Sequence, residues 1–184
     1  MLREILSVIT RAAGNFFSYL TLLRLIMICT YMSFQSPIGL FVLSVSNPLV
    51  LRIRKIVRPI GKLDTASLIA VWLVTMTQGV VLDLLNLRSM GNSYITELLV
   101  SSACKISLLL TDIYLFSTIT YAVLSWISPR NQTLPFFMAI VKTPIMTIRR
   151  VVKPIAQVDM SPFVLLLILN IIRIPLKMLV PLWW

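Results

Sequence analysis

Hydrophobic positions along the chain are grouped into four long stretches that are separated by short polar segments. The stretches cover residues 16–34, 63–85, 94–128 and 159–180. A transmembrane helix needs about 20 mainly apolar residues, so each stretch is long enough to cross a bilayer. The third has about 35 residues, or about 52 Å of helix, and we expect it to bend or to project beyond the membrane. This pattern predicts an all-α membrane protein with four transmembrane helices.

The charged residues between these stretches predict the orientation of the chain. Residues 35–62 contain five Lys or Arg and no acid, and residues 129–158 repeat this composition. The connection between the second and third stretches, from Asp83 through Arg88 to Glu97, has a net charge of −1. By the positive-inside rule, both basic segments are expected in the cytoplasm and both termini outside it. The first 15 residues could add a turn in the membrane interface.

Two internal segments are similar to each other. Residues 54–64 read RKIVRPIGKLD and residues 149–159 read RRVVKPIAQVD, at a constant offset of 95 positions. Five of these eleven positions are identical and four are conservative pairs. Upstream, Asn47-Pro48 corresponds to Thr143-Pro144 after a shift of one residue. The similarity predicts two parallel repeats, residues 1–90 and 91–184, each with a helix, a basic cytoplasmic segment and a second helix.

Each basic segment is predicted to form an amphipathic helix of about ten residues in the membrane interface. Pro48 and Pro144 suit the first turn of such a helix, whereas Pro59 and Pro154 disfavour its continuation. Hydrophobic residues recur at steps of three and four, with cations between them. We interpret the cations as contacts for anionic lipid headgroups or acidic partners: Arg52, Arg54, Lys55, Arg58, Arg149, Arg150 and Lys153. Ordinary positive-inside bias without a ligand is the alternative interpretation.

A carboxylate opens the second helix of each predicted repeat. Asp64 directly precedes residues 65–67, Thr-Ala-Ser, and Asp159 is followed after one residue by Ser161 and Pro162. Asp at such a position accepts hydrogen bonds from the first backbone N–H groups of a helix and favours the positive end of the helix dipole. We therefore expect both carboxylates to act as caps. An ion pair with a basic residue of the preceding helix, or an ion relay, is the alternative.

Three ionisable residues inside the hydrophobic stretches are candidate intramembrane charges, namely Arg24, Asp112 and Arg173. Counted from the cytoplasmic helix ends, Asp112 lies about 24 Å deep and Arg173 about 21 Å deep. Because these depths are similar, we predict that the two side chains pair. Arg24, about 15 Å deep, has no acid at its depth and is expected to extend its guanidinium toward the interface. If it were held in a polar cavity instead, it would mark an ion pathway.

The composition excludes several kinds of chemistry. The 184 residues include 17 Lys or Arg against six Asp or Glu, two Cys and no His. Without histidine the chain has no Ser-His or Cys-His pair and no imidazole ligand for zinc or haem. It has five Gly and contains neither a dinucleotide-binding motif nor a P-loop. We therefore expect no enzymatic activity, no cofactor, no metal site and no nucleic-acid partner.

Together these motifs resemble the YggT family, also called YlmG. The second predicted repeat is closer to the family pattern through Ser125-Trp126-Ile127, Thr143-Pro144, Ile148-Arg149-Arg150, Pro154 and Asp159-Met160-Ser161-Pro162. The first departs from it where Thr30-Tyr31-Met32 replaces Ser-Trp-Ile. The resemblance implies an integral membrane protein, located in the inner membrane in bacteria, with no established enzymatic activity. Roles suggested for relatives include osmotic-stress tolerance, cell-division-linked organisation and cytochrome assembly.

From the residues and the resemblance together, we expect a non-catalytic protein of the bacterial inner membrane that organises the cell envelope. Its partners would be anionic lipid headgroups, acidic or membrane-protein partners, and other copies of the same chain in a homo-oligomer. A link to osmotic-stress tolerance or cell division follows from the resemblance alone. The alternative is a small ion channel or transporter-like protein that supports ion balance under osmotic stress, which would need an oligomer to enclose a pore.

Overall fold

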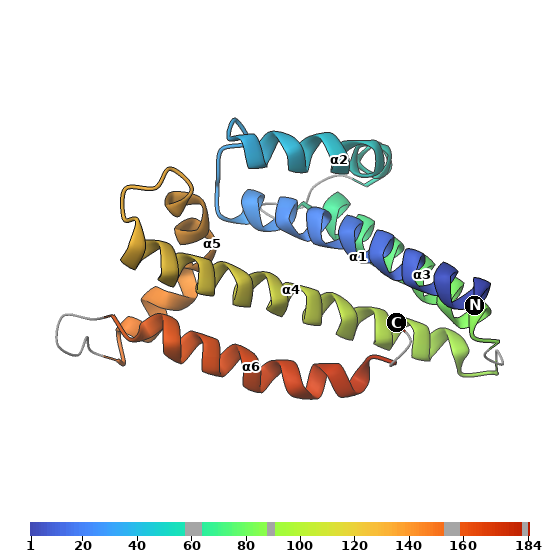
Figure 1. Ribbon diagram of the computed structural model, residues 1–184. Helices are drawn as coiled ribbons and strands as arrows, with labels where there is room; N and C mark the ends of the chain where they lie inside the picture. The colour runs from blue at the N-terminus through green and yellow to red at the C-terminus, as the bar shows by residue number, and fades with distance from the viewer. Residues whose placement is uncertain (58–63, 88–90, 153–158, 182–183) are drawn as a thin grey trace. The chain divides into compact units, whose positions relative to one another are not determined.

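Every regular element in the described part of the chain is an α-helix. The computed structural model describes residues 1–57, 64–87, 91–152, 159–181 and 184. In chain order the helices are α1 (Leu2–Cys29), α2 (Pro37–Arg54), α3 (Thr65–Leu85), α4 (Tyr94–Ile127), α5 (Leu134–Arg149) and α6 (Ser161–Leu179), as Figure 1 shows. The prediction of an all-α protein is therefore confirmed for these residues.

Among the described residues, five helices are long and apolar enough to cross a membrane, namely α1, α2, α3, α4 and α6. Four of them correspond to the predicted stretches, and α2 is one candidate span more than the sequence predicted. α1 begins at Leu2, well before residue 16, and ends at Cys29. It ends there because the chain turns back, with the Met32 N–H donating to the Met27 carbonyl at 2.9 Å. α4 is a single helix of 34 residues.

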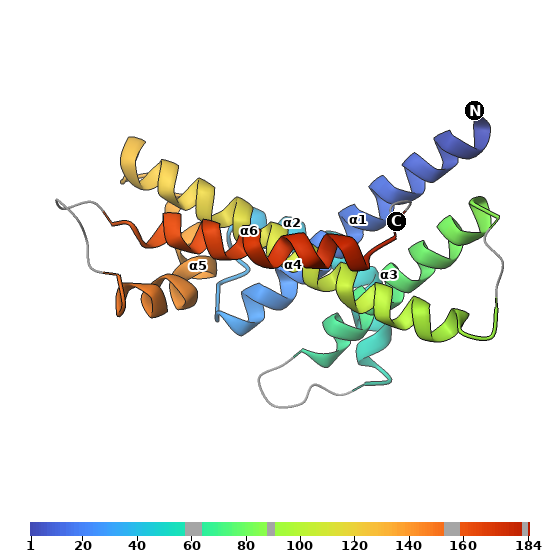
Figure 2. The ribbon, with the colours of Figure 1, turned by 90° about the horizontal axis from the view of Figure 1, so that it is seen from below.

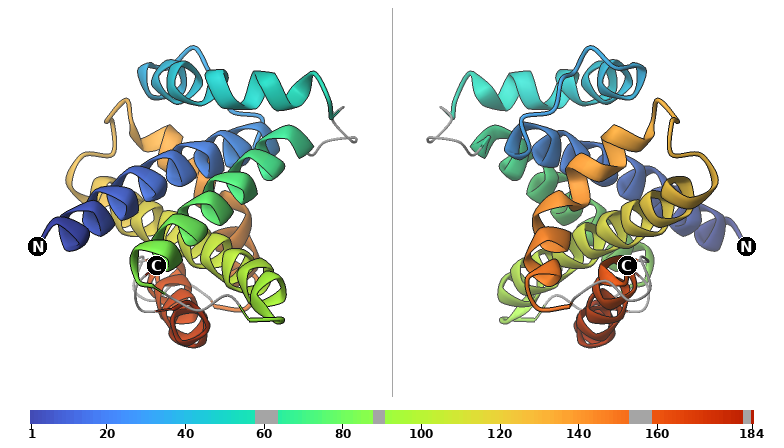
Figure 3. Two further views of the ribbon diagram at one scale, coloured as in Figure 1. Left: turned by 90° about the vertical axis from the view of Figure 1, so that its right-hand side faces the viewer. Right: turned by 90° about the vertical axis from the view of Figure 1, so that its left-hand side faces the viewer.

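The prolines expected to open two short basic helices lie inside longer helices. α2 begins at Pro37, where the Ser36 hydroxyl accepts a backbone N–H at 3.1 Å, and continues past Pro48. α5 begins at Leu134 and continues past Pro144. Both helices change direction along their length (Figure 3), as expected where a proline lacks its N–H donor and crowds the preceding turn. The predicted helix starts at Pro48 and Pro144 are therefore wrong, because earlier start signals nucleate each helix upstream.

The helices form two compact units, each described here by itself. Unit 1 consists of residues 1–110 and 176–184, and unit 2 consists of residues 111–175. The predicted repeats, 1–90 and 91–184, divide the chain by sequence similarity and stay a prediction. The first part of α4 belongs to unit 1 and the second part to unit 2.

In unit 1, α1 and α3 lie side by side and α2 packs against both, as Figure 1 and the left panel of Figure 3 show. At the start of α3, Ala66 and Ala70 pack against Val50 of α2. Small side chains at such a contact let two helix backbones approach closely. Near the end of α3, Leu82 packs against Trp184 and the first part of α4. Both ends of α3 are thus held by neighbouring elements.

In unit 2, the first part of α6 runs antiparallel to the second part of α4 (Figure 2). The rings of Trp126 and Phe163 lie 5.7 Å apart at one end of this helix pair. α5 joins α4 through Phe137, whose ring lies 6.1 Å from that of Phe116 in an edge-to-face arrangement. The ends of α4 and α5 and the start of α6 therefore come together at one end of unit 2.

Candidate functional site

A buried carboxylate in unit 1 has two arginine partners. Asp64 directly precedes α3, and its side chain is only 3% exposed. Its Oδ2 atom lies 2.7 Å from Arg54 Nη2 and 4.0 Å from Arg24 Nε. The Ser67 hydroxyl donates to the same oxygen at 2.7 Å. The carboxylate makes no side-chain cap to the α3 backbone, so the predicted cap is wrong at Asp64 and its alternative, ion pairing, is what the structure shows.

Arg24 is buried within unit 1 and has polar partners there. Its side chain is 4% exposed. Its Nη1 atom donates to the Ser46 hydroxyl at 2.9 Å and to the Asn47 side-chain oxygen at 2.8 Å. Buried charges persist where an opposite charge and hydrogen-bond partners replace water. Asp64, Ser46 and Asn47 thus supply partners that counting depth along one helix does not reveal. The extension of Arg24 toward the membrane interface stays a prediction.

A second Arg–Asp pair lies in unit 2. Arg149 ends α5, and its Nε donates to Asp159 Oδ2 at 2.9 Å, with a second bond from Nη2 to the same oxygen. Asp159 Oδ1 accepts the Ser161 backbone N–H at 3.0 Å, so here the predicted cap is present at the start of α6. Desolvation raises the pKa of the Asp159 carboxyl, but hydrogen bonds from Arg149 and Ser161 outweigh it and hold the pKa below its ordinary value. The bond to Asp159 raises the pKa of Arg149.

The two ion pairs occupy corresponding positions of the similar segments 54–64 and 149–159. In each, the arginine precedes the aspartate by ten residues. They differ in exposure, since the Asp64 side chain is 3% exposed and that of Asp159 is 32% exposed. A cavity of about 370 Å³ lies beside the second pair. It is lined by Tyr121, Ala122, Ser125, Trp126, Arg149, Asp159 and Pro162.

The remaining predicted cations divide into exposed residues and residues that the structure does not describe. Arg52 and Lys55 near the end of α2 and Arg150 after α5 are exposed. Four predicted positions, two cations and two prolines, lie outside the described residues: Arg58, Pro59, Lys153 and Pro154. Both described basic ends thus combine an arginine held in an ion pair with neighbouring cations that face outward.

The predicted intramembrane pair is in contact within unit 2. Arg173 Nε on α6 donates to Asp112 Oδ1 on α4 at 2.6 Å. The Asp112 side chain is about one-fifth exposed and that of Arg173 about one-third. Because the pair joins antiparallel helices far from the Trp126–Phe163 contact, it aligns α4 and α6 at a second point along their length.

A further polar network in unit 1 was not predicted. Gln78 on α3 donates through Nε2 to the Asn15 side-chain oxygen and to the Arg11 carbonyl, both at 3.2 Å. Its Oε1 accepts from the buried Lys105 ammonium of α4 at 2.9 Å. The network therefore connects α1, α3 and α4. The signal in the sequence was an uncharged amide within an apolar stretch, next to Gly79, and only the packing identifies its partners.

The indole of Trp184 is seated beside this network. Its Nε1 donates to Asp83 Oδ1 at 3.2 Å, and the Lys105 ammonium lies 5.9 Å from its ring centre, within cation–π range. A Cβ atom on Gly79 would lie 2.3 Å from the indole, so only glycine allows this approach. Trp184 thus brings an aromatic ring and a donor to two ionisable side chains that occur inside candidate spans.

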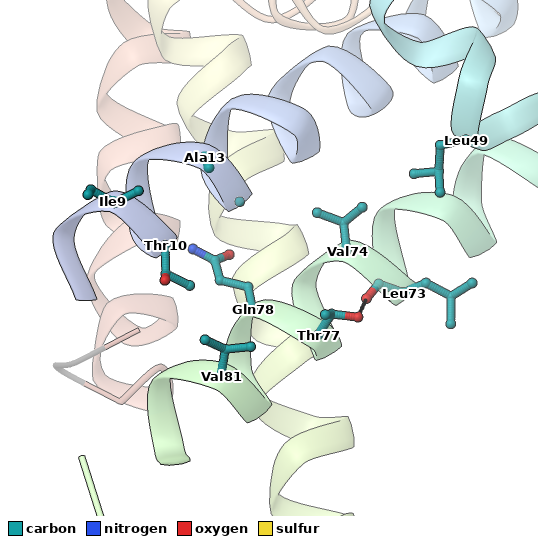
Figure 4. A pocket seen from close by; sticks show the side chains of 10 residues that line it. Ile9, Thr10, Ala13, Leu49, Leu73, Val74, Thr77, Gln78 and Val81 are labelled. Atoms are coloured by element: carbon teal, nitrogen blue, oxygen red, sulfur yellow. Dashed lines mark hydrogen bonds between the residues drawn. The ribbon is translucent and has the colours of Figure 1, made fainter. Parts of the chain in front are cut away.

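Unit 1 also contains a cavity, of about 470 Å³, which lies between α1 and α3 (Figure 4). Its lining is mainly apolar, and Figure 4 shows the Gln78 amide pointing from α3 toward α1. The lining residues are Ile9, Thr10, Ala13, Gly14, Leu49, Leu73, Val74, Thr77, Gln78 and Val81. This cavity therefore borders the Gln78 network on its α1 side.

In the part of the chain that the structure describes, no group of three or more His, Cys, Asp or Glu could hold a metal ion. Cys29 and Cys104 are free thiols. The chemistry that the described polar groups offer is therefore charge pairing, hydrogen bonding and cation–aromatic contact.

Most of the chain is similar in sequence to known bacterial proteins. A sequence model of the CCB3/YggT family matches residues 3–85 and 100–180. The uncharacterised protein YggT of Escherichia coli K12 is 24% identical over 85% of this chain and 81% of its own length. An uncharacterised protein of Pseudomonas aeruginosa is 27% identical over 89% of this chain and 84% of its own length. No solved structure matches. The resemblance seen in the motifs is thereby confirmed, and the chain belongs to the CCB3/YggT family.

Proposed function

We propose that this protein is a non-catalytic integral membrane protein that helps to organise the bacterial inner membrane and envelope. It does so by binding anionic lipid headgroups or acidic partners through the basic ends of α2 and α5. A contribution to osmotic-stress tolerance or cell division would be the cellular outcome of this organisation.

The observation that carries the proposal is the recurrence of the Arg–Asp pair at both basic ends. Arg54 is tied to Asp64 and Arg149 to Asp159, which anchors each basic end to the start of the next candidate span. The neighbouring cations are exposed. A cation near an anionic leaflet contributes about 1 kcal/mol of attraction. Fixed ends that present cations therefore supply a binding surface whose position relative to the spans is defined.

The test is the affinity of the purified full-length protein for phosphatidylglycerol, measured by native mass spectrometry of lipid adducts released from detergent micelles. We expect the double variant Arg52→Gln/Arg150→Gln to bind this lipid about 30-fold more weakly, because two cations at about 1 kcal/mol each are removed. The matched control is Arg3→Gln/Lys177→Gln, which removes two exposed cations elsewhere and should bind as the wild type does. Equal affinities for all three proteins would contradict the proposal.

The proposal places both basic ends at the cytoplasmic face and both termini outside, which requires that α2 does not cross the membrane. If α2 crossed as a fifth span, the termini would lie on opposite sides, because an odd number of crossings separates them. Reporter fusions at each terminus, active on one side of the membrane only, measure this directly. Termini on opposite sides would contradict the proposed orientation.

A second candidate function, an ion pathway, is favoured by the buried network around Gln78 and Lys105. Counted along α4 from Tyr94, Lys105 lies about 16 Å from the helix start, and ionisable side chains at such positions often mark ion pathways. The test is ion flux into liposomes that contain the purified protein. We expect Lys105→Met to change this flux if the network conducts. Absence of flux through folded wild-type protein would contradict this second candidate and leave the first untouched.

A further inference from the structure

The two Arg–Asp pairs differ in how their carboxylates are enclosed. In unit 1, Asp64 faces both Arg54 and Arg24. The Ser67 hydroxyl donates to the same carboxylate, and the Asp64 side chain is only 3% exposed. Asp64 therefore has two guanidinium partners and almost no contact with solvent.

In unit 2, a cavity lies beside the corresponding carboxylate. At the offset of 95 residues that relates the two segments, Arg24 corresponds to Ile119, which carries no charge. Among the described residues, Asp159 has an ion pair with one cation, Arg149, and its side chain stays 32% exposed. The cavity, which is also lined by the small side chain of Ala122, therefore leaves room for a second positive group beside Asp159.

The other residues that line the cavity suit an ammonium group with N–H donors. Tyr121 and Trp126 line it with aromatic rings, a residue type that attracts ammonium groups, and Ser125 contributes a hydroxyl oxygen. The Asp159 carboxylate provides the opposite charge. A volume of about 370 Å³ is ample for a headgroup-sized ligand and falls in the range of small-ligand pockets.

Cationic side chains next to this cavity suit an anionic group. A guanidinium has five N–H donors. Arg149 uses two of its nitrogen atoms on Asp159 and has a further hydrogen bond with Tyr121, which still leaves donors for a phosphate. A second cavity of about 150 Å³ shares Tyr121 and Arg149 with the first and is also lined by Lys142. Positive and negative partners for a ligand with both charges therefore lie side by side.

The location indicates where such a ligand comes from. The lining residues come from the last two turns of α4, the end of α5, the segment just before α6 and the first turn of α6. Ends of spanning helices lie at the level of lipid headgroups, where Trp and Tyr are enriched. A molecule with neighbouring ammonium and phosphate groups at that level is a zwitterionic phospholipid.

We propose that this cavity binds a phosphoethanolamine headgroup, with its primary ammonium at Asp159 and its phosphate at Arg149 and Lys142. The inference rests on the proposed contact with lipids but adds a specific site in unit 2 and a zwitterionic lipid. The ammonium supplies Asp159 with a second positive partner, as Arg24 does for Asp64 in unit 1. The Arg54–Asp64 pair is in this view a closed structural element, and the Arg149–Asp159 pair is a binding site.

The first experiment places an arginine in the wall of the cavity. Purified full-length protein is titrated with phosphatidylethanolamine in detergent micelles, and bound lipid is counted by native mass spectrometry. We expect Ala122→Arg to weaken binding at least 10-fold, because the new guanidinium fills the cavity and pairs with Asp159. The control is Val123→Arg, which adds the same charge at the next, exposed position outside the cavity and should bind like the wild type.

The second experiment uses the wild-type protein alone and does not depend on a variant that folds. Phosphatidylethanolamine is compared with its mono-, di- and trimethylated forms, the last being phosphatidylcholine. Each methyl group removes one N–H donor, so we expect stepwise weaker binding, with a total loss of at least 10-fold. Free phosphoethanolamine is then added as a competitor. If it displaces bound phosphatidylethanolamine at a similar concentration, the site belongs to a soluble headgroup compound. If it does not, the site belongs to the lipid.

Equal binding of all four methylation states would overturn the inference, as would equal loss in Ala122→Arg and Val123→Arg. These outcomes differ from failure of the proposed function, which is measured with phosphatidylglycerol and with Arg52 and Arg150. A protein that binds phosphatidylglycerol normally but ignores headgroup methylation would retain the proposed function and lose this site.

Discussion

Replacing Arg24 by methionine tests whether the buried charge cluster holds unit 1 together. Methionine is a flexible side chain that fills irregular apolar space, so the change removes mainly the guanidinium. It leaves Ser46 and Asn47 without their donor and Asp64 with Arg54 as its remaining arginine. We expect unit 1 to lose stability.

The magnitude follows from the distances. Opposite charges 4.0 Å apart, as for Arg24 Nε and Asp64 Oδ2, attract by about 4 kcal/mol at an effective dielectric constant of about 20. Each of the two lost hydrogen bonds to a charged group adds about 1.5–3 kcal/mol. The desolvation cost of Arg24 disappears with the charge and offsets part of this sum. The expected loss is about 3–5 kcal/mol, typical of removing one partner from a buried ion pair.

The assay is unfolding in dodecyl maltoside micelles with increasing sodium dodecyl sulfate, followed by the helical circular dichroism signal. Arg24→Lys keeps the charge but loses the planar guanidinium, so it should cost less than Arg24→Met. The double variant Arg24→Met/Asp64→Asn removes both charges, and we expect a coupling energy of about 1–3 kcal/mol between the two positions.

The reasoning would be refuted if Arg24→Met cost less than about 1 kcal/mol, the upper range for exposed ion pairs. Arg3→Met, at an exposed position of α1, measures the effect of losing a solvated arginine and should change the midpoint little. Equal midpoints for Arg24→Met and Arg3→Met would show that the Arg24 guanidinium contributes no more to stability than an exposed arginine.

Three further predictions use related measurements. Asp112→Arg and Arg173→Asp should each destabilise the protein in the same unfolding assay, and combining them should recover about 1 kcal/mol or more if the two charges couple; additive losses would exclude the pair. Gly79→Leu should lower the free energy of unfolding by about 1–3 kcal/mol, because its Cβ would lie 2.3 Å from the Trp184 indole. An unchanged midpoint would show that the Trp184 indole does not pack against Gly79. The pKa of Asp159 is lowered, so its stabilising effect is present above the ordinary value of about 3.9 and is lost as the pH falls through the lowered value. The Ser161 amide shift, followed by nuclear magnetic resonance, should therefore titrate below that value, and a midpoint at or above it would disprove the depressed pKa.

Positions of hydrophobic residues alone predicted the helical class and four of the five candidate spans, because backbone hydrogen bonds in a bilayer must be satisfied within each helix. Such bonds depend on the local chain, so α3 and α6 begin within about two residues of where the pattern places them. The Arg–Asp pairs were anticipated only as the alternative to capping, and their arginines, Arg54 and Arg149, were identified by the structure. The start of α2 was predicted wrongly, because Ser36 and Pro37 begin the helix upstream of Pro48.

The tertiary structure decided which side chains meet. Arg24 pairs with a carboxylate 40 positions further along the chain, and Gln78 meets Lys105 from another helix. Neither partnership has a local signal, because side-chain contacts between helices depend on how the helices rotate and cross. The same holds for the cavity beside Asp159, which is lined by residues of α4, α5 and α6. The sequence by itself thus determined the segments and the repeated motif, while packing between distant segments determined which charges are buried, paired or left open to a ligand.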